Sequence, residues 1–226
     1  ENAIKDLTKA APRPWTLKTY KQVKGKIQAW IYDKLQTPTA GSTETRVRTR
    51  TRRWMLTGTP RVITDAIIRN IRSIARMVPP RVQAAVLSTL YNRWTTKRRF
   101  QLDPTRGCLL CRKGDDSIEH YAPCHITRTF AANRLGLHYE AHQARDLLFF
   151  SRPPPNLTNT PNLWPKVALL TYALYRTTNA IRHGQTLSEQ EVHRALGQAL
   201  YEATRGHPTA TGLVTEVWRR NVRART

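Results

Sequence analysis

The residues with the clearest capacity for chemistry are three cysteines and one histidine within a short stretch. Cys108 and Cys111 form a C-x-x-C pair, and His120 and Cys124 follow, four residues apart. A cysteine pair on a tight turn, followed by two ligands one helical turn apart, presents four donors to one tetrahedral ion. Thiolates and neutral imidazole are the donors that structural Zn²⁺ prefers. The spacing therefore predicts a structural Zn²⁺ site with Cys108, Cys111, His120 and Cys124 as ligands.

Short elements must position these ligands. Asp116 or Ser117 would cap a short helix that carries His120 and Cys124 on one face. Three cysteines cannot form a complete disulfide framework, so a metal site in a reducing compartment is favoured. The alternative is a set of reduced cysteines with a purely structural role. Three further histidines lie close enough along the chain to replace a ligand: His125, His138 and His142.

Catalysis by this site is not expected, because four protein ligands leave no open position for a substrate or water. The nearest acids, Asp115, Asp116 and Glu119, are explained as helix-start charges. The zinc-deaminase pattern also fails. Its H-x-E precedes the cysteine pair, whereas His138–Glu140 follows it. The sequence thus predicts a protein that is not an enzyme.

Charge is the most unusual property of the composition. The 226 residues contain 38 Lys and Arg against 15 Asp and Glu, a formal net charge of +23. Such an excess favours a polyanionic partner, and nucleic acid is the commonest. A membrane surface is disfavoured because the charges are spread along the chain rather than gathered on one amphipathic segment. No apolar run approaches a membrane span, and no signal-peptide core is present.

The basic residues are densest between Arg46 and Phe100, where 14 Lys and Arg accompany one acid, Asp65. The alternating arginines of 46–53 predict an extended arm along a phosphate backbone, with a solvated linker as the alternative. Arg112 and Lys113 form a basic tip that either contacts RNA or is an ordinary solvated turn. The predicted nucleic-acid-binding residues are Arg46, Arg48, Arg50, Arg52, Arg53, Arg69, Arg72, Arg76, Lys97, Arg98, Arg99, Arg112 and Lys113. Aromatic candidates for stacking on bases are Trp54, Trp94 and Phe100, although Trp94 also fits a buried helical stripe.

Apolar residues recur at spacings of three and four, and no apolar alternation of period two is present, so a mostly α-helical fold is predicted. Helices are expected over 15–35, 60–78, 80–94, 126–135, 139–150, 164–181, 188–204 and 211–222. The domain plan is an N-terminal helix and linker (1–45), an arginine-rich arm and basic helical pair (46–107), a CCHC module with short helices (108–150), and a Pro-rich connector with C-terminal helices (151–226). The fold class is a helical domain stapled by a small zinc site, with a basic extended arm and tail.

Three stretches resemble a known family region: Pro79–Gln101, Cys108–Cys111 and Asp116–Cys124. They are similar to the C-terminal zinc-binding region of non-LTR retrotransposon reverse transcriptases, and the resemblance covers about residues 79–205. It implies that the four Cys and His residues bind zinc and that adjacent basic residues hold template RNA or target DNA. The chain lacks the family's paired-aspartate polymerase motif and any endonuclease constellation.

These observations predict a non-catalytic, RNA-binding structural protein of a ribonucleoprotein. Its partners would be RNA, most specifically rRNA, and neighbouring subunits, with no membrane and no small-molecule substrate. A divergent mitochondrial ribosomal protein is the specific hypothesis, because a chain that begins at Glu1 rather than Met would suit organelle import. The alternative is a C-terminal nucleic-acid-binding fragment of a retrotransposon reverse transcriptase, for which the nucleus is the expected location.

Overall fold

The structure is a computed structural model that describes residues 45, 47–49, 54–100, 107–184 and 187–223, with the backbone alone at 100 and 216–223. The predicted helix over 15–35 lies outside these residues. Residues 44–226 form one compact unit. Their buried hydrophobic side chains make a single cluster that draws on segments from Val47 to Leu213.

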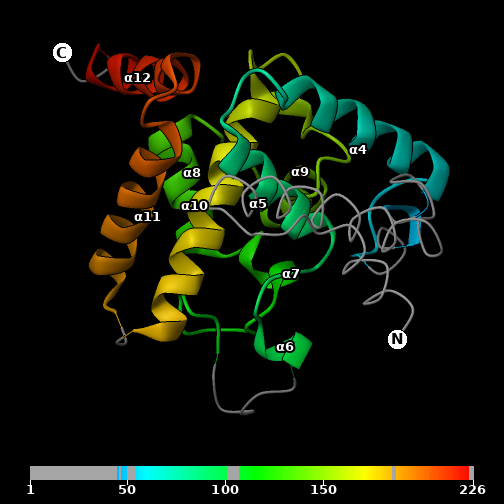
Figure 1. The fold of residues 1–226 in the computed structure, drawn as a ribbon, viewed down its shortest axis with the longest axis horizontal. Helices are drawn as coiled ribbons and strands as arrows, with labels where there is room; N and C mark the ends of the chain where they lie inside the picture. The colour runs from blue at the N-terminus through cyan, green and yellow to red at the C-terminus, as the bar shows by residue number, and fades with distance from the viewer. Residues whose placement is uncertain (1–44, 46, 50–53, 101–106, 185–186, 224–226) are drawn as a thin grey trace, which may run out of the picture. The chain divides into compact units, whose positions relative to one another are not determined.

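Most of the described residues are helical, which confirms the mostly α fold class. No strand occurs among them, and their one isolated β-bridge joins Gly107 to Asp115. The elements, drawn in Figure 1, are α4 (Pro60–Ile74), α5 (Pro80–Leu90), α6 (Lys97–Phe100), α7 (Ile118–Tyr121), α8 (His125–Leu135), η2 (Ala141–Gln143), α9 (Ala144–Leu148), η3 (Pro155–Leu157), α10 (Leu163–His183), α11 (Glu189–Thr204) and α12 (Pro208–Arg223).

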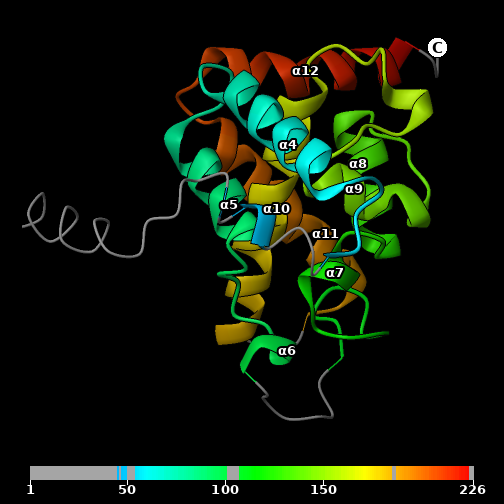
Figure 2. The same ribbon diagram turned by 90° about the vertical axis from the view of Figure 1, so that its right-hand side faces the viewer.

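Helix α10 is the centre of the unit. It contacts α11, α5, α4 and α8, and Val167, Leu170 and Leu174 on its predicted stripe are at most 1% exposed. Figures 1 and 2 both show α10 between the other helices, with α12 lying across the end where α10 begins. The short helices α6 and α7 lie toward the opposite end, where α10 finishes. The sequence between α5 and α8, which contains the cysteines, is therefore placed beside the last turns of α10.

Helix boundaries follow local chemistry. Proline occupies the first position of α4 and α5, where its missing N–H costs nothing. The predicted capping box opens α11, with Ser188 accepting from the Glu191 N–H and Glu191 accepting from the Ser188 N–H. Gly136 ends α8 in a left-handed conformation with φ 64°, which a residue without Cβ adopts at little cost.

Two predictions about the basic segment are wrong. Residues 47–49 of the predicted arm are helical rather than extended, and Val47 packs into the core at 1% exposure. The rest of the predicted arm, 46 and 50–53, lies outside the described residues. Trp54, predicted as a base-stacking residue, is also 1% exposed and stacks on Phe149, with ring centroids 4.0 Å apart. Burying the Trp54 indole against another aromatic ring is more favourable in free energy than leaving it exposed to solvent.

Trp94 confirms the alternative placement in the core. It is 1% exposed, and its Nε1–H donates to Thr89 Oγ1 at 2.9 Å. The side chain of Phe100 lies outside the described residues. Within the part of the chain that the structure describes, no helix is both long and apolar enough to cross a membrane.

Candidate metal centre

Four side chains converge where the cysteine-containing segment meets α7 and α8. The ligand atoms of Cys108, Cys111, His120 and Cys124 all lie within 4.8 Å of one another. Cys111 Sγ is 3.4 Å from His120 Nε2, close to the roughly 3.6 Å expected between a sulfur and a nitrogen on one tetrahedral zinc. Cys108 and Cys124 are buried, and the other two are half-buried. The four predicted ligands are thus brought together and are able to bind a metal ion.

A tight turn places the first two sulfurs. The Cys108 N–H donates to the Gly114 carbonyl and the Arg112 N–H donates to the Cys108 carbonyl, both at 2.9 Å. Gly114 has φ 70°, and a Cβ built there would lie 2.5 Å from the His120 ring. Only glycine therefore allows the turn to approach the imidazole this closely.

A short helix places the histidine. Ser117 is the N-cap of α7 and its hydroxyl accepts from the His120 N–H at 3.1 Å, so Ser117 rather than Asp116 performs the predicted capping role. Cys124 then donates its N–H to the His120 carbonyl at 3.0 Å and is the N-cap of α8. His120 and Cys124 are consequently held one turn apart, but the prediction that a single short helix carries both is wrong, because α7 ends at Tyr121 and Cys124 precedes α8.

The electrostatics of the site favour a cation. A hydrogen bond from the Cys108 thiol lowers the pKa of Cys124 to about 5. The same contact, together with burial, raises the pKa of Cys108, and burial raises the pKa of Cys111. Without a metal, the Cys124 thiolate is therefore stable beside two protonated thiols, whereas three thiolates would repel one another. A bound divalent ion offsets that repulsion, and its binding would release protons from the thiols.

Among the described residues, the neighbouring histidines and Glu119 stand outside the cluster of four ligands. His125, considered as a substitute ligand, is exposed and lies 3.9 Å from Glu189. His138 and His142 are exposed and stand outside the cluster. Glu119 contacts Arg98 at 3.5 Å. The four protein donors are enough to fill the tetrahedral shell of one metal ion.

A buried ion pair beside the site was missed by the sequence analysis. Asp116 is 1% exposed and accepts two hydrogen bonds from the Arg182 guanidinium of α10, at 2.8 and 3.1 Å. It also accepts from the Lys97 N–H at 2.9 Å and from the Tyr121 hydroxyl. Burial, with the Asp116 charge nearby, raises the pKa of Tyr121, so that hydroxyl stays protonated and donates. Asp116 is thus not a helix-start charge, and no local spacing signals a partner 66 residues away.

These bonds connect the metal cluster to three parts of the fold. Lys97 belongs to α6, Arg182 to the last turn of α10, and Arg112 donates to the Leu187 carbonyl at 3.0 Å just before α11. The segment that carries the ligands therefore fixes α6, α10 and the start of α11 relative to one another. Disrupting it would change the surface that those elements build.

The predicted nucleic-acid-binding residues are distributed over several elements. Arg46, Arg50, Arg52 and Arg53 lie outside the described residues, and Arg48 is half-buried in the helical stretch 47–49. The exposed ones are Arg69 and Arg72 on α4, Arg76 just after it, Arg98 and Arg99 on α6, and Arg112 and Lys113 on the metal-site turn, while Lys97 is half-buried.

No family model, curated protein or solved structure matches the chain.

Proposed function

We propose that the protein is a non-catalytic RNA-binding component of a ribonucleoprotein, in which a structural Zn²⁺ fixes the helices that present a basic surface. The ligand set of three thiols and one imidazole supports zinc over harder cations, which prefer oxygen donors. The net charge of +23 supports a polyanionic partner. Zinc acts on folding here, and the RNA contacts come from arginines elsewhere.

The observation that carries the proposal is a line of exposed arginines on one side of α4. Arg61, Arg69 and Arg72 lie within an arc of about 80° when α4 is viewed along its axis, and Arg76 follows in the turn after the helix. Ile63, Ile67 and Ile74 are buried on the other side. None of the four arginines forms an ion pair with a described residue. Asp65 is also exposed on this side, one helical turn from Arg61 and from Arg69, so the row contains one acid and keeps an excess of positive charge. A row of this kind suits a phosphate backbone, and from Arg61 to Arg72 it extends about 17 Å.

This arginine line is what an experiment should test. The zinc-loaded chain would be titrated with single-stranded RNA at several salt concentrations, followed by fluorescence anisotropy. Each phosphate contact on a single strand contributes about 0.7 to the slope of log affinity against log salt. Replacing Arg69, Arg72 and Arg76 by Gln should reduce the slope by about 2 and weaken binding to all sequences alike.

A matched control removes the same charge elsewhere. Arg134 on α8, Arg194 on α11 and Arg205 after α11 are also exposed, and their replacement by Gln should change the slope much less. Equal losses in the two triple variants would show that the arginine line is not the contact surface. Binding of the unaltered chain that ignores salt would refute the electrostatic mechanism altogether.

The specific setting we propose is a mitochondrial ribosome, with rRNA as the ligand. The alternative, supported by the Cys and His arrangement itself, is the nucleic-acid-binding region of a non-LTR retrotransposon reverse transcriptase. Sedimentation of the protein from cell extracts separates them. Comigration with ribosomal particles favours the first, and comigration with free element RNA or DNA favours the second.

A further inference from the structure

A cavity of about 210 Å³ lies beside α9, far along the chain from the metal ligands. It is formed by the loop before α4, by η2 and by the start of the Pro-rich segment. The residues that line it are Thr57, His142, Gln143, Asp146, Arg152 and Pro153–Pro155. Pockets for drug-sized ligands measure about 300–1,000 Å³, so this one suits a single planar ring system rather than a large cofactor.

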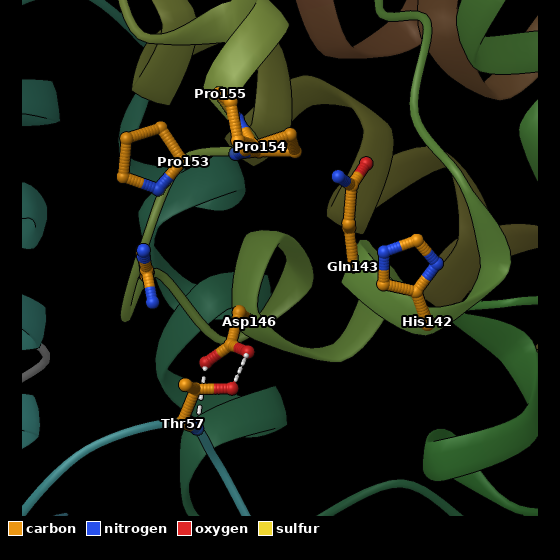
Figure 3. Close-up of a pocket in the computed structure, with 8 residues that line it drawn as sticks. Thr57, His142, Gln143, Asp146, Pro153, Pro154 and Pro155 are labelled. Carbon is orange, nitrogen blue, oxygen red and sulfur yellow. Dashed lines mark hydrogen bonds between the residues drawn. The ribbon is translucent and has the colours of Figure 1, made fainter.

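The floor of the cavity contains one carboxylate, and its oxygens are hydrogen-bonded within the protein. Asp146 accepts from the Thr57 N–H at 3.2 Å, from the Thr57 hydroxyl at 2.8 Å and from the Ser151 hydroxyl at 2.6 Å. Figure 3 shows both carboxylate oxygens turned toward Thr57 and away from the prolines. The carboxylate oxygens are therefore engaged by three neutral donors of the protein itself and need no hydrogen bond from a ligand.

The walls carry groups that remain available. His142 and Arg152 are exposed, and neither side chain bonds to another described residue. Gln143 uses its Oε1 to accept from the Glu140 N–H at 3.1 Å. Figure 3 shows its amide nitrogen on the side facing Pro154. An imidazole, a guanidinium and an amide donor thus surround a space with rigid pyrrolidine walls.

We propose that this cavity binds one unpaired base of the RNA, an inference that rests on the function proposed above. The planes of His142 and Arg152 would stack on the base, and the Gln143 amide would donate to its edge. Imidazole and guanidinium planes are common platforms for unpaired bases in RNA recognition. The prolines restrict the width of the space without competing for hydrogen bonds.

The position of the cavity supports this occupant over a free small molecule. Thr57 lies three residues before Pro60, the first residue of α4, and Arg61 at the start of the arginine line is exposed. A strand whose phosphates follow the arginine line of α4 would come to the loop that contains Thr57 at the beginning of the helix. One base turned out of such a strand would enter it.

The test uses the zinc-loaded chain and two probes of equal charge. One is a single-stranded RNA of about 12 nucleotides, and the other is the same oligomer without bases. His142→Ala should weaken binding of the base-bearing RNA about tenfold and leave the abasic probe unaffected. Arg152→Lys keeps the charge but removes the planar guanidinium, so it should give the same selective loss. His138→Ala, an exposed histidine outside the cavity, should behave as the unaltered chain.

The outcomes separate this inference from the proposed function. If His142→Ala and Arg152→Lys bind both probes like the unaltered chain, no base occupies the cavity, although RNA binding stands. Equal losses for the two probes would assign the cavity to the sugar–phosphate backbone and overturn the base inference. Failure of the unaltered chain to bind either probe would refute the proposed function, and the base site with it.

Discussion

Replacing Arg182 by Met should destabilise the fold more than any other single arginine substitution on α10. The change preserves much of the aliphatic volume and removes the guanidinium that donates two hydrogen bonds to Asp116. Among the described residues, Asp116, at 1% exposure, would keep the Lys97 N–H and the Tyr121 hydroxyl as donors to its carboxylate. Removing one partner of a buried pair leaves an uncompensated charge, at a cost of about 3–5 kcal/mol.

The measurement is thermal and urea unfolding of the zinc-loaded chain, followed by circular dichroism. For a chain of this size, about 3–5 kcal/mol corresponds to a fall in Tm of about 6–20 °C. Arg176→Met is the matched control, because Arg176 lies on the same helix and its pair with Glu202 is exposed, with side chains 59% and 40% accessible. A surface pair of this kind contributes about 0–1 kcal/mol.

A double-variant cycle identifies the cause of the loss. Asp116→Asn removes the carboxylate charge while keeping its shape, so a chain that already carries this substitution should lose little more when Arg182 is also replaced. The argument fails if Arg182→Met and Arg176→Met reduce stability equally. It also fails if the losses from Asp116→Asn and Arg182→Met simply add, because residues in direct contact must couple.

Three further predictions concern other parts of the fold. Gly114→Ala should lower Zn²⁺ affinity at least tenfold in a chelator competition, because the added Cβ would lie 2.5 Å from the His120 ring; unchanged affinity would mean that the turn adapts freely. Trp54→Ala should reduce the free energy of unfolding by about 3–5 kcal/mol, since the indole is buried against Phe149, and a loss below about 1 kcal/mol would argue for an exposed ring. Arg81→Ala should cost about 1–3 kcal/mol, because its guanidinium donates to three carbonyls at the end of α11; urea unfolding that gives no change would show that water replaces those bonds.

Local signals in the sequence predicted most of the described helices and the convergence of the four candidate metal ligands, but they missed α6 and the helical residues 47–49. Proline starts, the Ser188 capping box and the spacing of apolar residues place the α-helices within a few residues of their observed ends. The four ligands lie within a short stretch, so their spacing alone predicts their convergence. Ser117 as the cap of α7 also follows from local chemistry.

Local signals of this kind could not predict contacts between segments that are distant in the sequence. The charge on Asp116 looks local, but its partner is Arg182 on another helix. Trp54 follows a run of arginines and so suggests a nucleic-acid contact, yet a distant phenylalanine, Phe149, decides its burial. In both cases a tertiary neighbour determines the role, and residue type and spacing do not identify that neighbour.

The short span of the ligand set has a consequence for the order of folding. Closing the loop between Cys108 and Cys124 restricts a small part of the chain, whereas the bond between Asp116 and Arg182 closes a loop of 66 residues. The longer closure costs about 1.3 kcal/mol more in chain entropy. A bound zinc ion would therefore favour a pathway in which its loop forms first and offers a preformed surface to the last turns of α10. We expect refolding from urea to be slower with a chelator present. Without the metal, the loop between Cys108 and Cys124 would not form early, so α10 would have no preformed surface to pack against.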